Sequence, residues 1–77
     1  METFPVKLPI ELGQFIKLAG LTETGGQAAE AISSGAFSVN GNVETRRRHK
    51  LAEGDVVSAT TLDGEVVALR VGSRERA

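Results

Sequence analysis

Apolar residues recur at helical spacing between Ile10 and Ala19. Steps of three, one and three residues separate them, which places their side chains on one face of an α-helix. Gly20 is a suitable C-terminal stop for this helix. Gly13 lies inside it and costs up to about 1 kcal/mol relative to alanine, so the helix needs tertiary packing. The apolar face consists of Leu12, Phe15, Ile16 and Ala19.

A second helix is predicted to begin at Thr24 and to end at Gly35. Thr24 and Gln27 have the spacing of a capping box, in which the hydroxyl accepts a hydrogen bond from the Gln27 amide and the Gln27 side chain reaches back. About four residues separate the two predicted helices, which indicates a helix-turn-helix-like pair. The apolar face of the second helix is small and consists of Ala28, Ala31 and Ile32.

The rest of the chain alternates between apolar and polar residues, as strands do. Phe4 to Leu8 predicts a short strand, which Pro5 confines to a sheet edge. Val56 to Leu62 and Glu65 to Val71 predict two more strands, joined by a turn at Asp63-Gly64. Glu53-Gly54-Asp55 predicts the turn that precedes them.

A hairpin is predicted around Asn40-Gly41, the strongest short hairpin signal in a sequence. A two-residue loop pairs Val39 with Asn42 and turns Val43 to the opposite face. A three-residue loop keeps Val39 and Val43 on the same face, and this register is preferred. Phe37 alternates with Val39 on the strand that enters the hairpin.

These elements predict an α+β domain in which the two-helix motif packs on a small antiparallel sheet of four to five strands. The domain is expected to occupy residues 1–72, and residues 73–77 are expected to form a flexible polar tail. The chain of 77 residues contains no cysteine, which excludes a disulfide scaffold and a thiolate metal site. It shows neither a secretory signal nor an apolar run of roughly 18 residues. We therefore expect a cytoplasmic monomer without membrane contact.

Positive charge is concentrated in one segment although the net charge is −1. If this segment continues the hairpin strand, Arg46, Arg48 and Lys50 share one face, and Arg47 and His49 share the other. Guanidinium groups suit phosphate because they offer paired donors in one plane, so the run predicts a site for RNA or another polyanion. The alternative is a solvated strand whose charges protect a sheet edge. The run consists of Arg46, Arg47, Arg48, His49 and Lys50.

Gly25 and Gly26 are a second candidate for anion binding. At the start of a helix their amides are free, no side chain covers them, and the helix dipole favours negative charge. The alternative is that glycine simply suits a tight interhelical turn. His49 is interpreted as a surface donor, and Lys17 as a solvated charge, with a contribution to a basic groove as the alternative.

No catalytic site is indicated, since no credible pair of nucleophile and base is present. No cofactor or metal is expected either. Phe4, Phe15 and Phe37 all fall at predicted core positions, so recognition is expected to rest on phosphate and RNA shape. The remaining alternative to an RNA-binding module is an adaptor that docks an acidic protein through the basic run.

More than half of the chain, from Ile10 to Asp55, resembles the S4-like RNA-binding domain, and more closely its stand-alone bacterial branch, the YbcJ-like family. The resemblance implies the helical αL motif on a small sheet, and it implies that structured RNA, ribosomal or transfer, binds along a basic surface. It places RNA contacts on Gly25, Gly26, Gln27 and the basic run, and a ribosome or other ribonucleoprotein among the partners. Glu30 departs from the family pattern, which commonly has lysine there. The matching residues are Leu12, Phe15-Ile16-Lys17-Leu18, Thr24-Gly25-Gly26-Gln27-Ala28, Ile32, Gly35, Val39-Asn40-Gly41, Val43-Glu44-Thr45-Arg46-Arg47-Arg48, Lys50-Leu51 and Gly54-Asp55.

Overall fold

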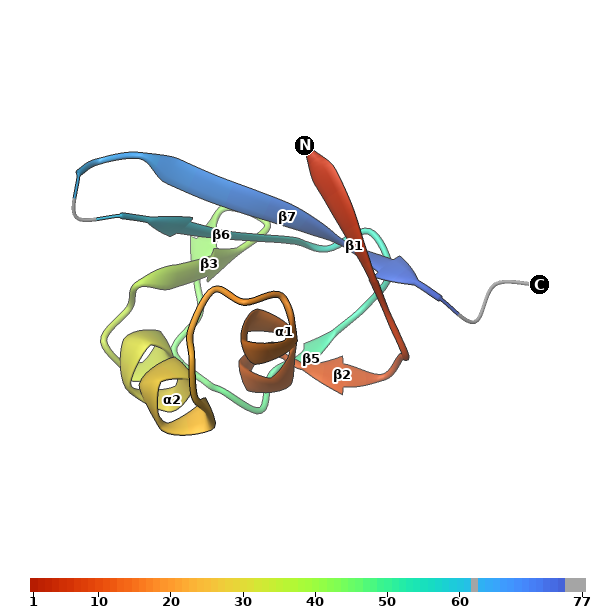
Figure 1. The fold of residues 1–77 in the computed structure, drawn as a ribbon, viewed down its shortest axis with the longest axis horizontal. Coiled ribbons are helices and arrows are strands. Elements are labelled where there is room, and N and C mark those ends of the chain that lie inside the picture. The colour runs from red at the N-terminus through yellow and green to blue at the C-terminus, as the bar shows by residue number, and fades with distance from the viewer. Residues whose placement is uncertain (62, 75–77) are drawn as a thin grey trace.

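Two helices lie against one face of a five-stranded sheet in the computed structural model, which describes residues 1–61 and 63–74 (Figure 1). The large sheet has the order β1-β7-β6-β3-β4, and β2 and β5 form a separate two-stranded sheet. The predicted α+β class is confirmed. One pair departs from the antiparallel expectation, since β1 runs parallel to β7. The elements are β1 Glu2–Val6, β2 Ile10–Glu11, α1 Leu12–Leu18, α2 Gly25–Ser33, β3 Phe37–Val39, β4 Asn42–Val43, β5 Lys50–Leu51, β6 Val56–Thr60 and β7 Val66–Ser73.

The core lies between the helices and the large sheet. Phe15 of α1 is fully buried, and its ring meets the ring of Phe4 edge-to-face, with centroids 5.8 Å apart. This arrangement is favourable for two aromatic rings beyond the area they bury. The two helices and the strands β1, β3, β6 and β7 are therefore held by one cluster, to which the edge strand β4 does not contribute. Its largest fully buried side chains are Phe15, Leu12, Ile16, Ile32, Val57 and Val71.

Helix α1 begins at Leu12, later than the apolar pattern predicts. Ile10 pairs with Leu51, and Glu11 pairs with Lys50, so both residues are extended. A strand pairing with a distant part of the chain therefore replaces the first turn of the predicted helix.

Helix α2 begins as predicted, with Thr24 as its N-cap. The Thr24 hydroxyl accepts a hydrogen bond from the Gln27 amide at 3.1 Å. The second half of the predicted capping box differs, because the Gln27 side chain accepts from the amide of Glu23 at 3.0 Å. The helix ends before Gly35, as expected.

The Asn40-Gly41 hairpin has a two-residue loop, so the prediction of a three-residue loop was wrong. Val39 pairs with Asn42, and Ser38 pairs with Val43. Asn40 and Gly41 both have positive φ angles, of 52° and 84°. This backbone twist matches the right-handed twist of the flanking strands, which is why Asn-Gly favours the shorter loop. Val43 consequently lies on the outer face and is 64% exposed.

The C-terminal hairpin follows the predicted order. Strand β6 covers most of the predicted strand, whose last residue, Leu62, lies outside the described residues. Ser73, expected in the tail, is still part of β7, and the Arg74 amide donates to the Val6 carbonyl at 3.1 Å. The rest of the expected tail, residues 75–77, lies outside the described residues. Within the described part of the chain, no helix has the length and apolarity to cross a membrane.

Candidate nucleic-acid interface

The basic run forms a turn, so its predicted continuation of the hairpin strand was wrong. Strand β4 ends at Val43, and the His49 amide donates to the Arg46 carbonyl at 3.1 Å. Arg47 and Arg48 are therefore the two central residues of a β-turn. The expected split of the run between two strand faces does not occur. The chain must leave the large sheet here and cross the helical side of the molecule to form β5 (Figure 1).

Two backbone hydrogen bonds attach this turn to α1. The amide of Leu12 donates to the His49 carbonyl, and the amide of Gly13 donates to the Arg47 carbonyl, both at 2.9 Å. Amides in the first turn of a helix have no partner within the helix, so the turn supplies acceptors that α1 needs. A Cβ on Gly13 would lie 3.4 Å from the Arg47 carbonyl oxygen. Glycine inside α1, unfavourable on local grounds, thus allows the turn to approach closely.

The turn and the two helices enclose a groove, called here the loop–helix groove, with a volume of about 320 Å³. Arg47 and Arg48 enter it from the turn, Lys17 from α1, and Gly25 from the start of α2. No side-chain hydrogen bond or ion pair engages these three cations within residues 1–61 and 63–74. The groove is lined by Glu11, Gly13, Gln14, Lys17, Gly25, Ala29, Arg47 and Arg48.

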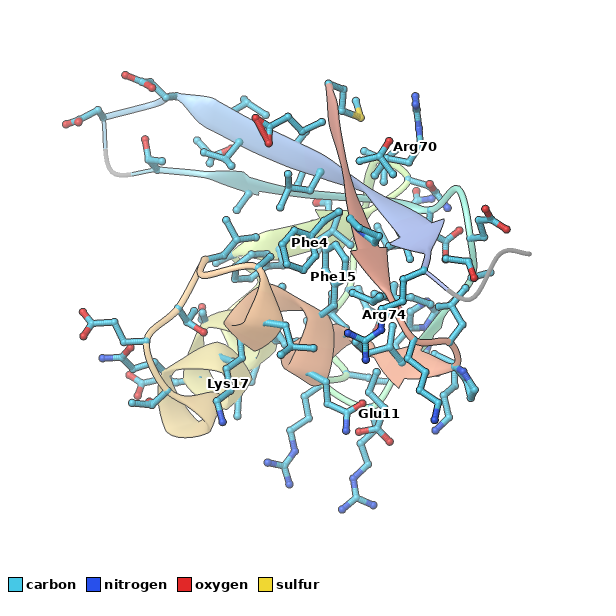
Figure 2. All side chains as sticks on the ribbon, turned by 45° about the vertical axis from the view of Figure 1, so that its right-hand side comes forward. Phe4, Glu11, Phe15, Lys17, Arg70 and Arg74 are labelled. Carbon is cyan, nitrogen blue, oxygen red and sulfur yellow. The ribbon has the colours of Figure 1, made fainter. Side chains whose placement is uncertain are left out.

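Positive charge in the loop–helix groove outweighs negative charge. Glu11 is the carboxylate that lines it, and its Oε2 accepts from the Lys50 Nζ at 3.3 Å. Figure 2 shows Lys17 and Glu11 on the helical side of the molecule, whereas Arg70 projects from the far side of the sheet. The amides of Gly25 and Gly26 have no hydrogen-bond partner among the described residues. Uncommitted cations and free helix amides together favour an anion.

Arg46 and His49 belong to a different cluster, centred on Glu44. The Glu44 carboxylate accepts from the Arg46 Nε at 3.0 Å and from the Arg46 amide, also at 3.0 Å. The Nδ1 of His49 lies 3.2 Å from the other Glu44 oxygen. These contacts close the turn on its outer side and commit the Arg46 guanidinium within the protein. Three members of the predicted run, Arg46, His49 and Lys50, therefore do not line the loop–helix groove.

The hydrogen bonds from the Arg46 side chain, assisted by the Arg46 amide, lower the pKa of Glu44 from 4.5 to about 2. A carboxyl whose pKa is lower in the folded than in the unfolded state stabilises the fold above the unfolded value. That contribution fades as the pH falls from 4.5 through about 2. We expect Glu44→Gln to be less stable than the unsubstituted protein at neutral pH, with the difference closing across this window. Urea denaturation at several pH values measures it, and a difference independent of pH would contradict the assignment.

The predicted RNA-contacting residues of α2 also divide between the loop–helix groove and the surface outside it. Gly25 lines the loop–helix groove, whereas Gln27 faces another part of the surface together with Glu30. Gly26 does not line the groove, although its free amide lies at the same helix start. Glu30, the departure from the family pattern, is thus outside the groove. The position on α2 that enters it, one turn after Gly25, is Ala29.

Two lining residues of α1 were not identified as a pair from the sequence. Gln14 and Lys17 are three residues apart, so they lie on the same side of the helix. That spacing was the available signal, but it does not reveal which part of the chain faces the pair. The preferred interpretation of Lys17 as only a solvated charge was incomplete, because Lys17 lines the loop–helix groove.

Two helices on a small sheet, with a cationic groove where a basic turn meets a helix start, define a class of small α+β domains suited to anion binding. The chain belongs to the S4 domain family, whose sequence model matches residues 7–69. It is 44% identical over 59 residues to "Putative RNA-binding protein YbcJ" of Escherichia coli (strain K12), which covers 77% of this chain and 84% of that protein. YbcJ of Shigella flexneri has the same identity and coverage. "Probable ribosome maturation protein RlbA" of Bacillus subtilis (strain 168) is 46% identical over 48 residues, which is 62% of this chain and 68% of that protein.

Proposed function

We propose that this chain is a non-catalytic RNA-binding module that holds structured RNA, ribosomal or transfer, in the loop–helix groove. The membership of the S4 domain family and the printed name of the Escherichia coli relative support binding of RNA. The name of the Bacillus subtilis relative refers to ribosome maturation, which makes ribosomal RNA the first candidate.

The observation that carries the proposal is that Arg47, Arg48 and Gly25 line the same groove. Guanidinium groups from one side and free amides from the other can donate to the same phosphate. The backbone that carries each donor set is held in place beforehand, because the turn is bonded to α1 and α2 is capped by Thr24. Binding therefore has to order the exposed side chains of Arg47 and Arg48 but not the backbone beneath them.

The number of uncommitted cations sets the expected salt dependence. Lys17, Arg47 and Arg48 can neutralise about three phosphates, so log K should fall against log salt with a slope of about −2 to −3. This slope describes a moderate binder. Phosphate contacts of this kind depend on the position of the RNA backbone and on the shape of the RNA. They give no direct information about the base sequence.

A pair of substitutions at Gly25 tests the site. Nothing lies within 4 Å of a Cβ at this position, so Gly25→Asp and Gly25→Ala should both keep the fold. Aspartate adds a negative charge beside the proposed phosphate, and like charges brought together in an interface are costly. We expect Gly25→Asp to raise the Kd for ribosomal RNA fragments about tenfold, whereas Gly25→Ala stays close to the unsubstituted protein. Fluorescence anisotropy measures both.

Circular dichroism serves as the control for folding, since aspartate in the first turn of a helix is compatible with the helix dipole. Equal RNA affinity of Gly25→Asp and Gly25→Ala would contradict the proposal. Sequencing of RNA crosslinked to the protein in cells then distinguishes ribosomal from transfer RNA.

A further inference from the structure

An apolar cavity adjoins the loop–helix groove. It lies between the segment that follows β1 and the outer side of α1, and its volume is about 440 Å³. Leu18, which forms one wall, is 63% exposed, an unusual position for a large apolar side chain at the end of a short helix. Such concave apolar sites with a few polar groups are typical of ligand binding. The cavity is lined by Lys7, Leu8, Pro9, Ile10, Gln14, Lys17 and Leu18.

The cavity and the groove are neighbours along α1, because Gln14 and Lys17 line both. A ligand that extends from the groove along α1 therefore passes Lys17 and reaches Leu18. The described lining of the cavity includes the two cations Lys7 and Lys17 and no carboxylate. Neither lysine has a side-chain partner within the described residues. The cavity thus combines an apolar floor with positive charge at its edges.

We propose that this cavity receives an unpaired nucleotide of the RNA, with its base against Pro9 and Leu18 and its phosphates near Lys7 and Lys17. This inference rests on the proposed function and specifies its ligand as structured RNA that carries an unpaired nucleotide beside a helical segment. A nucleotide joins a flat base with apolar faces to an anionic backbone, which is the combination that the lining matches. Bases within a duplex cover one another, so only an unpaired base can present its face to the protein.

The aliphatic floor supplies what the aromatic residues of this chain cannot. Phe15 and Phe37 are buried, and Phe4 packs on the core, so none of them offers a free ring for stacking. Flipped or splayed bases are also held between apolar side chains in other binding pockets. Recognition here consequently extends beyond phosphate and shape to the presence of an unpaired base.

Two RNA probes and two matched protein variants test this inference. The probes are a fluorescent RNA hairpin whose stem is fully paired and whose loop is a non-nucleotide linker, and the same hairpin with one unpaired uridine within its stem. Leu18→Ser removes the apolar wall, and Val66→Ser removes a similarly exposed side chain, 69% exposed, on β7. We expect Leu18→Ser to raise the Kd for the bulged hairpin about five- to tenfold and to leave that for the paired hairpin unchanged. Val66→Ser should change neither.

Lys7→Gln provides a second variant, because Lys7 lines the apolar cavity and not the loop–helix groove. Lys7→Gln should also weaken binding of the bulged hairpin and leave binding of the paired hairpin unchanged. Equal effects of Leu18→Ser on both hairpins, or no effect on either, would overturn the inference. Binding of an acidic, leucine-rich peptide that depends on Leu18 and displaces no RNA would overturn it in favour of a protein partner.

The paired hairpin separates this inference from the proposed function. If the unsubstituted protein binds the paired hairpin and Gly25→Asp weakens that binding, the proposed RNA-binding function is supported independently of the result for Leu18→Ser. If no RNA binds in a Gly25-dependent manner, the function and the inference both fail.

Discussion

Replacing Arg47 and Arg48 together with glutamine is expected to weaken binding of structured RNA about ten- to a hundredfold. Both side chains line the loop–helix groove, and neither has a partner within the described residues. Each can therefore donate to phosphate without breaking a contact in the protein. Both side chains are exposed, so each contact should contribute no more than an ordinary hydrogen bond, about 0.5–1.5 kcal/mol in net terms. Two such contacts together give about 1–3 kcal/mol, and each 1.4 kcal/mol is a factor of about ten in Kd. Loss of two phosphate contacts should also reduce the salt slope by about 1.4–1.8.

The control for this double substitution is Arg70→Glu, which changes the net charge by the same amount. Arg70 projects from the far side of the sheet (Figure 2). If the groove binds the RNA, Arg70→Glu should have a much smaller effect, because exposed charges farther apart than the Debye length of about 8–10 Å are largely screened. The measurement is the Kd by fluorescence anisotropy at two or more salt concentrations. Equal losses from both proteins would show that net charge, and not the groove, determines the affinity.

Replacing Phe15 with alanine is expected to remove a large part of the free energy of unfolding and to lower the midpoint of thermal unfolding by at least about 12 °C. Phe15 is fully buried, and its ring packs edge-to-face on Phe4, so the substitution removes contacts between α1 and the edge strand β1. Truncation of a buried phenylalanine costs about 3–5 kcal/mol. A domain of 77 residues has a total free energy of unfolding of only about 4–12 kcal/mol. Thermal unfolding followed by circular dichroism measures the loss.

Leu18→Ala is the matched control, since it shortens an apolar side chain on the same helix that is 63% exposed. Its cost should stay within about 0.5 kcal/mol, as for most surface substitutions. A loss of similar size at Phe15 and Leu18 would mean that α1 does not pack on the sheet as described.

Several elements could be predicted because their causes are local. Apolar spacing places α1 and α2, Thr24 provides a side-chain acceptor for the first turn of α2, and Asn40-Gly41 supplies the backbone angles of a tight hairpin. The register of that hairpin was predicted wrongly, because a three-residue loop that keeps Val39 and Val43 on the same face was preferred. Local turn geometry decided it instead, and Val43 remains on the outer face.

The start of α1 shows the limit of local reasoning. Ile10 falls within the predicted helix but pairs with Leu51, far along the chain. The same pairing takes the basic run out of the sheet and makes it a turn. A periodic pattern reports the preference of a segment on its own, and such a preference of a few tenths of a kcal/mol per residue is readily overridden by tertiary contacts.

By itself the sequence determined that this protein has two helices, a small sheet and one concentrated segment of positive charge, because composition, spacing and turn residues act over a few neighbouring positions. Only the tertiary structure decided how that charge is used. Glu44 engages Arg46 and His49, and Glu11 engages Lys50, while Arg47 and Arg48 line the loop–helix groove together with Gly25 of α2. The physical reason is that a cation becomes available to a ligand only where folding brings it no carboxylate. The contact with Glu11 and the position of α2 arise between parts of the chain that are distant in sequence.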